Sequence, residues 1–241
     1  MNSSLLNHPR RGITLVEAVI IIALVAIVAA LIFPPYTGPR VKSANVKALS
    51  NARQISLALR LYADDHGGKY PSFTLKDGKP TTTPVRDSNT AFAQLFPDYL
   101  TTEAIFWVPQ SPFCSTNPPD EITDKPPLDT PVDTLKPGEN EWAYVLQLTE
   151  SSAPAFPLIA SGFADPVAHT YTADSTKKGG RWKGAQVIVT RLDGSSAVLP
   201  IDQATMQVTG SNGAATPGDI FTTANSANGW LAPENTVVNP K

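Results

Sequence analysis

The sequence predicts an α+β protein in which a long N-terminal helix packs on a small antiparallel sheet. An apolar run at 13–33 is followed by apolar residues at helical spacing between 41 and 62. Segments rich in β-branched and aromatic residues then occupy the second half of the chain. The 23 prolines exclude an all-helical bundle, because a proline inside a helix costs about 3 kcal/mol.

Composition narrows the classes of function. A length of 241 residues suits one domain with an appended segment. The net charge of −2, with 17% charged residues, argues against a broad nucleic-acid surface. One cysteine excludes an internal disulfide and any multi-cysteine zinc site, and three histidines leave little room for a histidine-rich metal centre.

The apolar run 13–33 has the length of a membrane span, and Glu17 is its one charged residue. As a helix it would be about 31 Å long, close to the thickness of a bilayer core. Arg10 and Arg11 precede the run, which favours a cytoplasmic N-terminus and export of the remaining chain.

Three interpretations of this segment compete. A plain signal anchor explains its length and its basic flank. A secretory signal peptide would use the small residues at 28–30 as its cleavage site. Neither explains Glu17, since a carboxylate within a membrane costs about 2.5–3.5 kcal/mol and such residues are functional by default.

The third interpretation explains Glu17. Residues 10–17, RRGITLVE, resemble the processing site of the type IV pilin and pseudopilin superfamily. The resemblance implies a cytoplasmic leader 1–12, cleavage by prepilin peptidase between Gly12 and Ile13, and N-methylation of Ile13. Glu17 then falls at the fifth mature position, where the family has a nearly invariant glutamate.

The chemistry of this arrangement is a charge pair. Cleavage would create an α-ammonium at Ile13 beside a hydrocarbon phase, and pairing with Glu17 would offset the desolvation of both charges. The resemblance implies that Glu17 meets the amine of a neighbouring subunit and sets the register of a filament. The alternative is a tolerated helix-end charge whose side chain reaches the interface.

The helix is expected to kink or break at 34–39, PPYTGP, because Pro35 disfavours helical geometry at Pro34. A proline at this distance from the processing site is common in the pilin family. Such a joint would let the apolar stalk reorient between membrane and filament; the alternative is simply the exit of the chain from the membrane.

The segment 34–71 is predicted to be an amphipathic helix with its end turn. Its apolar stripe consists of Val41, Ala44, Ala48, Ala52, Ile55, Leu59 and Tyr62, widened by Leu49, Leu57, Ala58 and Leu61. The helix should end near Asp65, because Gly67 and Gly68 supply a stop. The segment 58–71 resembles the helix end of the major pseudopilin, with one extra residue before Tyr70, and implies that Tyr62 and Tyr70 pack there.

The globular part, 72–241, is predicted to contain a short helix at 89–100 and a long proline-rich loop at 109–137. The predicted strands are 142–149, 156–161, 185–192 and 195–201, the last two joined by a two-residue turn at Asp193-Gly194. The segment 203–229 is rich in Thr, Ala, Gly and Asn; partial order is expected there, anchored by Ile220, Phe221, Trp230 and Leu231.

No residue pattern predicts an enzyme. His66 and His169 are far apart in the sequence, and Cys114 has no nearby histidine. Major pseudopilins often bind calcium in a C-terminal loop, and oxygens could come from Asp165, Asp174, Asp193 and Asp202. These aspartates are scattered and suit turns and strand ends, so no cofactor is expected, with Ca²⁺ as the alternative.

Together these observations predict a non-enzymatic subunit of a type II secretion pseudopilus or related filament. Its partners would be copies of itself or related pilins, prepilin peptidase, an inner-membrane assembly platform and the lipid bilayer, with no nucleic acid. It would cross the inner membrane once, with a periplasmic C-terminal domain, and enter a periplasmic or extracellular filament after assembly.

Two other functions remain open at this point. One is a type IV pilin of a surface fibre for adhesion, motility or DNA uptake; the region around Tyr62, Tyr70 and Pro71, and the absence of a C-terminal cysteine pair, favour the pseudopilus. The other is a membrane-tethered exterior enzyme or binding domain.

Overall fold

The structure is a computed structural model that describes residues 14–32, 37–77, 79–121, 133–211, 217–223 and 230–241. The chain divides into two compact units, Met1–Ala44 and Asn45–Lys241. The class is α+β with antiparallel sheets, as the sequence predicts, and it is compatible with a pilin-like fold.

Two long helices open the chain: α1 spans Leu15–Ile32 and α2 spans Thr37–Asp65. The expected joint at 34–39 is only partly testable, because Pro34 and Pro35 lie outside the described residues. The last part of the expected joint, Thr37–Pro39, already belongs to α2. Pro39 is tolerated because it lies in the first turn, where the N–H that proline lacks would have no helical partner.

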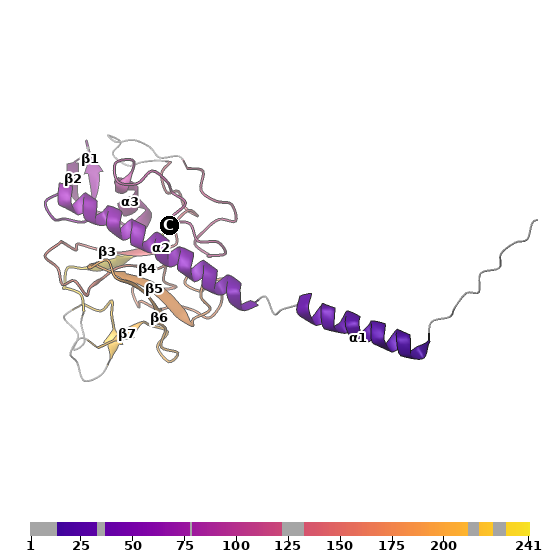
Figure 1. The fold of residues 1–241 in the computed structure, drawn as a ribbon. Helices are drawn as coiled ribbons and strands as arrows, with labels where there is room; N and C mark the ends of the chain where they lie inside the picture. Colours follow the sequence, from indigo (N-terminus) through magenta and orange to yellow (C-terminus); the bar gives the residue numbers. More distant parts are fainter. Residues whose placement is uncertain (1–13, 33–36, 78, 122–132, 212–216, 224–229) are drawn as a thin grey trace, which may run out of the picture. The chain divides into compact units, whose positions relative to one another are not determined.

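From Asn45 onward, α2 covers the five-stranded sheet of the globular unit (Figure 1). The predicted stripe is confirmed at its centre, where Ala52, Ile55 and Leu59 are completely buried. The widening of the stripe is wrong for Leu57 and Leu61, which are 59% and 46% exposed. Small residues line the buried face, with Ala48, Ala58 and Ala63 each at most 3% exposed, so the helix backbone can approach the sheet closely.

The predicted end of α2 is confirmed. The helix ends at Asp65, and Gly67 and Gly68 follow with positive φ angles of 64° and 75°. The N–H of Gly68 donates to the carbonyl of Ala63 at 2.8 Å, which closes the last turn. Tyr62 and Tyr70 are each 4% exposed and pack beside this turn, as expected.

The central sheet has five antiparallel strands in the order β6-β5-β4-β3-β9. The strands are β3 (Trp142–Leu146), β4 (Pro157–Ser161), β5 (Gln186–Arg191), β6 (Ser196–Pro200) and β9 (Thr236–Val238). The four predicted strands correspond to β3, β4, β5 and β6, each somewhat shorter than expected. Every residue of β3 and β4 is buried, although side chains alternate between faces, so both faces of the sheet centre are covered.

The turn between β5 and β6 differs in detail from the prediction. Arg191 and Ser195 pair through the N–H of Arg191 at 2.8 Å, which leaves the three residues Leu192–Gly194 in the loop rather than two. Gly194 has a φ of 82°, and the Asp193 carboxylate accepts the N–H of Ser195 at 2.7 Å. This is the three-residue hairpin in which glycine takes the left-handed position.

A hairpin of β1 (Phe73–Lys76) and β2 (Lys79–Pro84) precedes the sheet and was not predicted. The helix expected at 89–100 is shorter: α3 spans Ser88–Phe92 and a 3₁₀ turn, η1, spans Ala93–Leu95. Asp87 caps α3 by accepting the N–H of Thr90 at 2.8 Å. The helical stretch stops because Phe96 precedes a proline and adopts extended geometry.

The proline-rich segment contains no helix or strand at its described residues, 109–121 and 133–137, as expected. Of the anchors expected in the C-terminal segment, Ile220, Phe221 and Leu231 are buried and Trp230 packs against the core. Two short strands, β7 (Thr209–Gly210) and β8 (Gly218–Asp219), pair within it.

Candidate processing and assembly site

Thr14 is the N-cap of α1. Its carbonyl accepts the first helical hydrogen bond, from Ala18 N–H at 3.1 Å, and its hydroxyl accepts the N–H of Glu17 at 3.3 Å. The sequence Thr14-x-x-Glu17 is the signature of a capping box. Sequence reasoning assigned Glu17 but missed the role of Thr14, although this spacing was the available signal.

Glu17 lies in the first turn of α1 with its side chain exposed. The exposed amides of a helix N-terminus favour a carboxylate there by about 0.3–1 kcal/mol. Gly12 and Ile13, the predicted processing and methylation residues, lie outside the described residues. The helix begins at Leu15, the third residue of the predicted mature chain, and Glu17 is three residues after its cap, Thr14.

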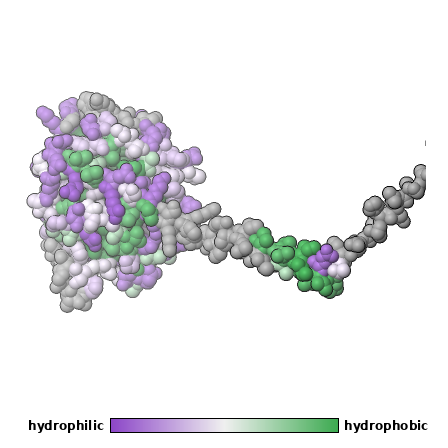
Figure 2. Space-filling view, in the orientation of Figure 1, coloured by the Kyte–Doolittle hydropathy of each residue, from purple (hydrophilic) through white to green (hydrophobic). Residues whose placement is uncertain are grey.

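The face of α1 seen in Figure 2 is largely apolar. Nine of its described apolar side chains are 49% to 82% exposed: Leu15, Val16, Val19, Ile20, Ile21, Ile22, Leu24, Val25 and Val28. Glu17 is the one charged residue in the sequence of this helix. A helix that is apolar on all sides is suited to complete burial in protein or lipid. Across the residues that the structure describes, no helix combines the length and hydropathy needed to cross a membrane.

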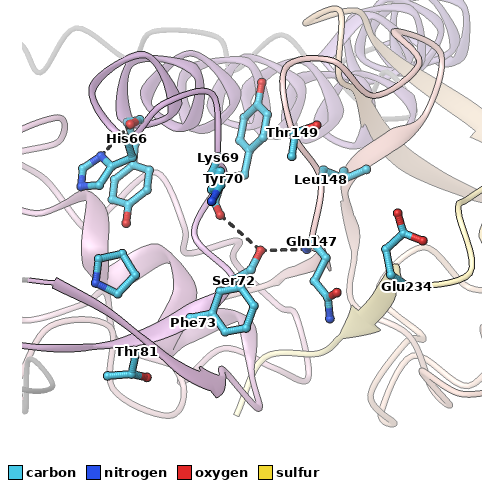
Figure 3. Close-up of a pocket in the computed structure, with 12 residues that line it drawn as sticks. His66, Lys69, Tyr70, Ser72, Phe73, Thr81, Gln147, Leu148, Thr149 and Glu234 are labelled. Carbon is cyan, nitrogen blue, oxygen red and sulfur yellow. Dashed lines mark hydrogen bonds between the residues drawn. The ribbon is translucent and has the colours of Figure 1, made fainter.

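The globular unit contains a pocket with a volume of about 560 Å³ between the end of α2, the β1–β2 hairpin and segment 147–149 (Figure 3). Two of its polar side chains, His66 and Ser72, bond nearby backbone groups. His66 stacks on Tyr62 with ring centroids 3.8 Å apart, and its Nδ1 bonds the carbonyl of Tyr62 at 2.7 Å. The Ser72 hydroxyl donates to the carbonyl of Tyr70 and accepts the N–H of Gln147. The pocket thus holds a histidine and a serine that bond backbone groups.

The other residues considered for catalysis lie apart from this pocket. The Sγ atom of Cys114 accepts the N–H of Val108 at 3.4 Å, and burial raises the pKa of this thiol to about 12, which disfavours the reactive thiolate. His169 bonds the Asp219 carboxylate at 2.6 Å and lies among the rings of Phe163 and Phe221. The structure therefore does not bring His66, His169 and Cys114 together.

The four aspartates considered for calcium each bind the backbone of their own turn. Asp165 accepts from Val167, Asp174 from Thr176, Asp193 from Ser195 and Asp202 from Ala204, at distances of 2.7–3.0 Å. Backbone hydrogen bonds lower the pKa of Asp165 and of Asp202 accordingly. The structure instead brings together Glu103, Asp120 and Glu139, which sequence reasoning missed because they are far apart in the chain.

The comparisons with known proteins concern the N-terminus. Residues 7–33 match the family model described as the prokaryotic N-terminal methylation motif. No curated protein and no solved structure matches the chain.

The motif, the capped start of α1 and its apolar surface define a class. The chain is type IV pilin-like at its N-terminus, and the motif supports processing by prepilin peptidase and assembly into filaments. The matched range includes the basic flank, Gly12, Ile13 and Glu17, which carried the prediction from sequence.

Proposed function

We propose that this protein is a non-enzymatic structural subunit of a type II secretion pseudopilus or a closely related filament. Prepilin peptidase cuts between Gly12 and Ile13 and methylates Ile13. The apolar helix holds the subunit in the inner membrane and then stacks in the filament core, leaving the globular unit in the periplasm or outside the cell. The match at 7–33 is the observation that carries this proposal.

The surface of α1 supports the assembly step. Its valine, leucine and isoleucine side chains are exposed on successive positions, so neighbouring helices could bury them from any side. Burial of each such side chain is worth about 1.5–3 kcal/mol. This gain applies to transfer from water. On leaving lipid, which is as apolar as the helix surface, association depends on close packing between the helices.

Glu17 supports a defined register within such a stack. It is the one charged residue of α1. A carboxylate surrounded by apolar helices needs a cation, and the α-ammonium created at Ile13 is available on every subunit. Methylation keeps this amine cationic, so the pair survives the modification.

Among the described residues, the candidate catalytic side chains His66 and Cys114 make local bonds to the backbone, which is compatible with the proposed mechanical role. His66 bonds a backbone carbonyl, Cys114 accepts a backbone amide, and the pKa of its thiol is raised by burial. The segment around Tyr62 and Tyr70 resembles the helix end of the major pseudopilin, and both tyrosines are buried. This resemblance favours the pseudopilus over the surface fibre.

The test compares three chains in the native host: the natural sequence, Glu17→Gln and Thr14→Ala. Glu17→Gln should be cleaved and methylated normally but should be lost from sheared or secreted filaments by at least tenfold, because its pairing charge is gone. Thr14→Ala is the matched control: it removes the capping hydroxyl, costs about 1 kcal/mol of helix stability and should leave incorporation nearly unchanged. Intact mass spectrometry checks that each chain begins at Ile13 and carries one methyl group.

Two outcomes would contradict the proposal. Normal filament incorporation of Glu17→Gln would refute the charge pairing. A mature chain beginning near Leu31 would indicate an ordinary secretory signal. Imaging the filaments on intact cells separates a short periplasmic pseudopilus from a surface fibre.

A further inference from the structure

Three carboxylates meet in the loops that precede β3. Glu103, Asp120 and Glu139 each present an oxygen within 4.8 Å of the oxygens of the other two. Glu103 is completely buried and Glu139 is 7% exposed, whereas Asp120 is exposed. The cluster therefore opens to solvent on its Asp120 side.

One carboxylate oxygen of Glu103 is buried and has no hydrogen-bond partner among the described residues. Its Oε1 accepts the N–H of Leu135 at 2.5 Å, while its Oε2 is buried without a hydrogen-bond partner among the described residues. Such an atom costs roughly 1–3 kcal/mol, and more when it is charged.

The cluster is held in position by backbone groups. The Glu121 carboxylate accepts the N–H of Glu103 at 2.9 Å, and the Glu139 carboxylate accepts the N–H of Lys136 at 2.6 Å. A buried, unpaired carboxylate oxygen is thus fixed beside two other carboxylates. The surrounding loops provide no hydrogen-bond partner for this oxygen among the described residues.

Several carboxylates gather around Glu103. Asp120 and Glu139 belong to the cluster itself, and Glu121 accepts the N–H of Glu103 and the hydroxyl of Thr102. Among the described residues, the ammonium of Lys136 ion-pairs with the cluster, at 2.7 Å from Asp120, and it also contacts Asp133 at 3.3 Å. The Asp120 and Asp133 side chains that pair with Lys136 are 39% and 49% exposed.

We propose that Glu103, Asp120 and Glu139 bind one divalent cation of the Ca²⁺ type. All three ligands are carboxylate oxygens, which suit hard cations rather than zinc. Ca²⁺ binds oxygens at about 2.3–2.6 Å, so oxygens on opposite sides of the ion lie about 5 Å apart. The spacing in the cluster needs little rearrangement to reach that geometry, and the exposed side leaves room for water ligands.

The ion would tie three separate loop segments to the start of the sheet. Glu103 lies next to Ile105 and Phe106, whose carbonyls accept hydrogen bonds from Trp142 Nε1 and Glu141 N–H. Glu139 is only three residues before β3. This inference does not depend on the proposed function, and it places the ion at residues other than the four aspartates considered from sequence.

The test uses the full chain in a mild detergent, first stripped with EDTA. Adding CaCl₂ to about 5 mM, against NaCl of equal ionic strength, should raise Tm by at least about 2 °C. Isothermal titration should find one Ca²⁺ per chain with a Kd of about 1 mM or below, the range of exported modules. MgCl₂ at the same concentration should give less than half of the shift.

Variants decide the location of the site. Glu103→Gln and Asp120→Asn should each abolish the Ca²⁺-dependent shift, and in EDTA Glu103→Gln should be at least as stable as the natural chain because it removes a buried charge. If Glu103→Gln does not fold, Asp120→Asn still tests the location of the site. Asp174→Asn, an exposed turn aspartate, is the control and should keep the shift.

A chain without saturable Ca²⁺ binding, or a full shift in both cluster variants, would overturn the proposal. A shift lost in Asp174→Asn instead would place the ion elsewhere and overturn it too. An equal shift with Mg²⁺ would overturn the assignment to Ca²⁺.

Discussion

Glu17 and Thr14 belong to one capping pattern at the start of α1 but have separate roles. The hydroxyl of Thr14 satisfies the N–H of Glu17, which starts α1 at a defined residue. The carboxylate of Glu17 stays exposed and is available for a partner. Local stability therefore depends on the threonine, and the proposed assembly depends on the glutamate, so the two roles can be separated by substitution.

Glu141 is a second residue whose charge matters, because it is buried at the start of the sheet with 1% exposure. Burial raises the pKa of Glu141 from 4.5 to about 8, although Ser111 donates a hydrogen bond to the carboxylate and Arg181 lies nearby. The folded state thus holds a proton that the unfolded state releases above pH 4.5. Its contribution to stability is complete below pH 4.5 and is lost as the pH rises to about 8.

The prediction is that Glu141→Gln becomes increasingly more stable than the natural chain as the pH rises from 5 to 8. The limit of this change is on the order of 4 kcal/mol, since each pKa unit is worth about 1.36 kcal/mol. Unfolding followed by tryptophan fluorescence across this pH range measures it. Glu234→Gln, at an exposed position, is the control; a difference between Glu141→Gln and the natural chain that is independent of pH would contradict the prediction.

At the scale of elements, α2 shows what periodicity predicts well. The centre of its stripe is buried, because residues three and four apart share one face. Leu57 and Leu61 do not belong to that face. They were assigned to it because they are apolar, but exposed leucines are common in helices. The spacing was more informative than the residue type.

Leu59 and Leu57 therefore form a matched pair on one helix. Leu59→Ala should lower the free energy of unfolding by about 2–5 kcal/mol, because it leaves a cavity at a completely buried position. Leu57→Ala, at a position that is 59% exposed, should change it by no more than about 0.5 kcal/mol. Urea unfolding of the two variants checks this, and equal losses would mean that α2 packs through a different face.

Strands with a clear turn signal were also predictable. Asp193-Gly194 located the β5–β6 hairpin, although the left-handed Gly194 makes a three-residue loop. The β1–β2 hairpin escaped prediction because Lys79–Pro84 is polar and contains two prolines, and its side chains are almost all exposed. A strand that buries nothing leaves no alternation of polar and apolar residues to detect.

At the scale of the molecule, the unpredicted feature is the return of the C-terminal segment to the sheet. β9 pairs with β3 through Tyr144 and Val238. Asn239 donates to the carbonyl of Phe163 at 2.9 Å and accepts the N–H of Phe163 at 3.0 Å. Three residues are too few for a periodic pattern, so only the distant partner strand defines this element.

Asn239→Ala should lower the free energy of unfolding by about 1–3 kcal/mol, because two backbone groups of Phe163 lose their partners. Thermal unfolding of the full chain in detergent measures the loss. Thr236→Ala, at an exposed position of the preceding strand β9, is the control and should change stability by less than about 0.5 kcal/mol. Similar losses in both variants would argue against a specific role for the asparagine.

The N-terminal site was predictable because its residues are consecutive, whereas the carboxylate cluster was not. Glu103, Asp120 and Glu139 approach one another only when the loops fold back toward β3. Glu103 and Glu139 flank the proline-rich segment 109–137, and a lone glutamate there carries no signal of its burial. The N-terminal motif could therefore be predicted from contiguous residues, whereas the carboxylate cluster could not, because its residues come together only in the folded chain.

The two edge strands of the central sheet limit pairing between neighbouring copies of the globular unit. β6 ends at Pro200, and β9 spans only Thr236–Val238 with Pro240 close behind. A short or proline-terminated edge offers few unpaired amides to a neighbouring copy. In the proposed filament, where many globular units would lie along a common axis, such edges disfavour pairing of one sheet with the next. Self-association would then depend on the apolar helix.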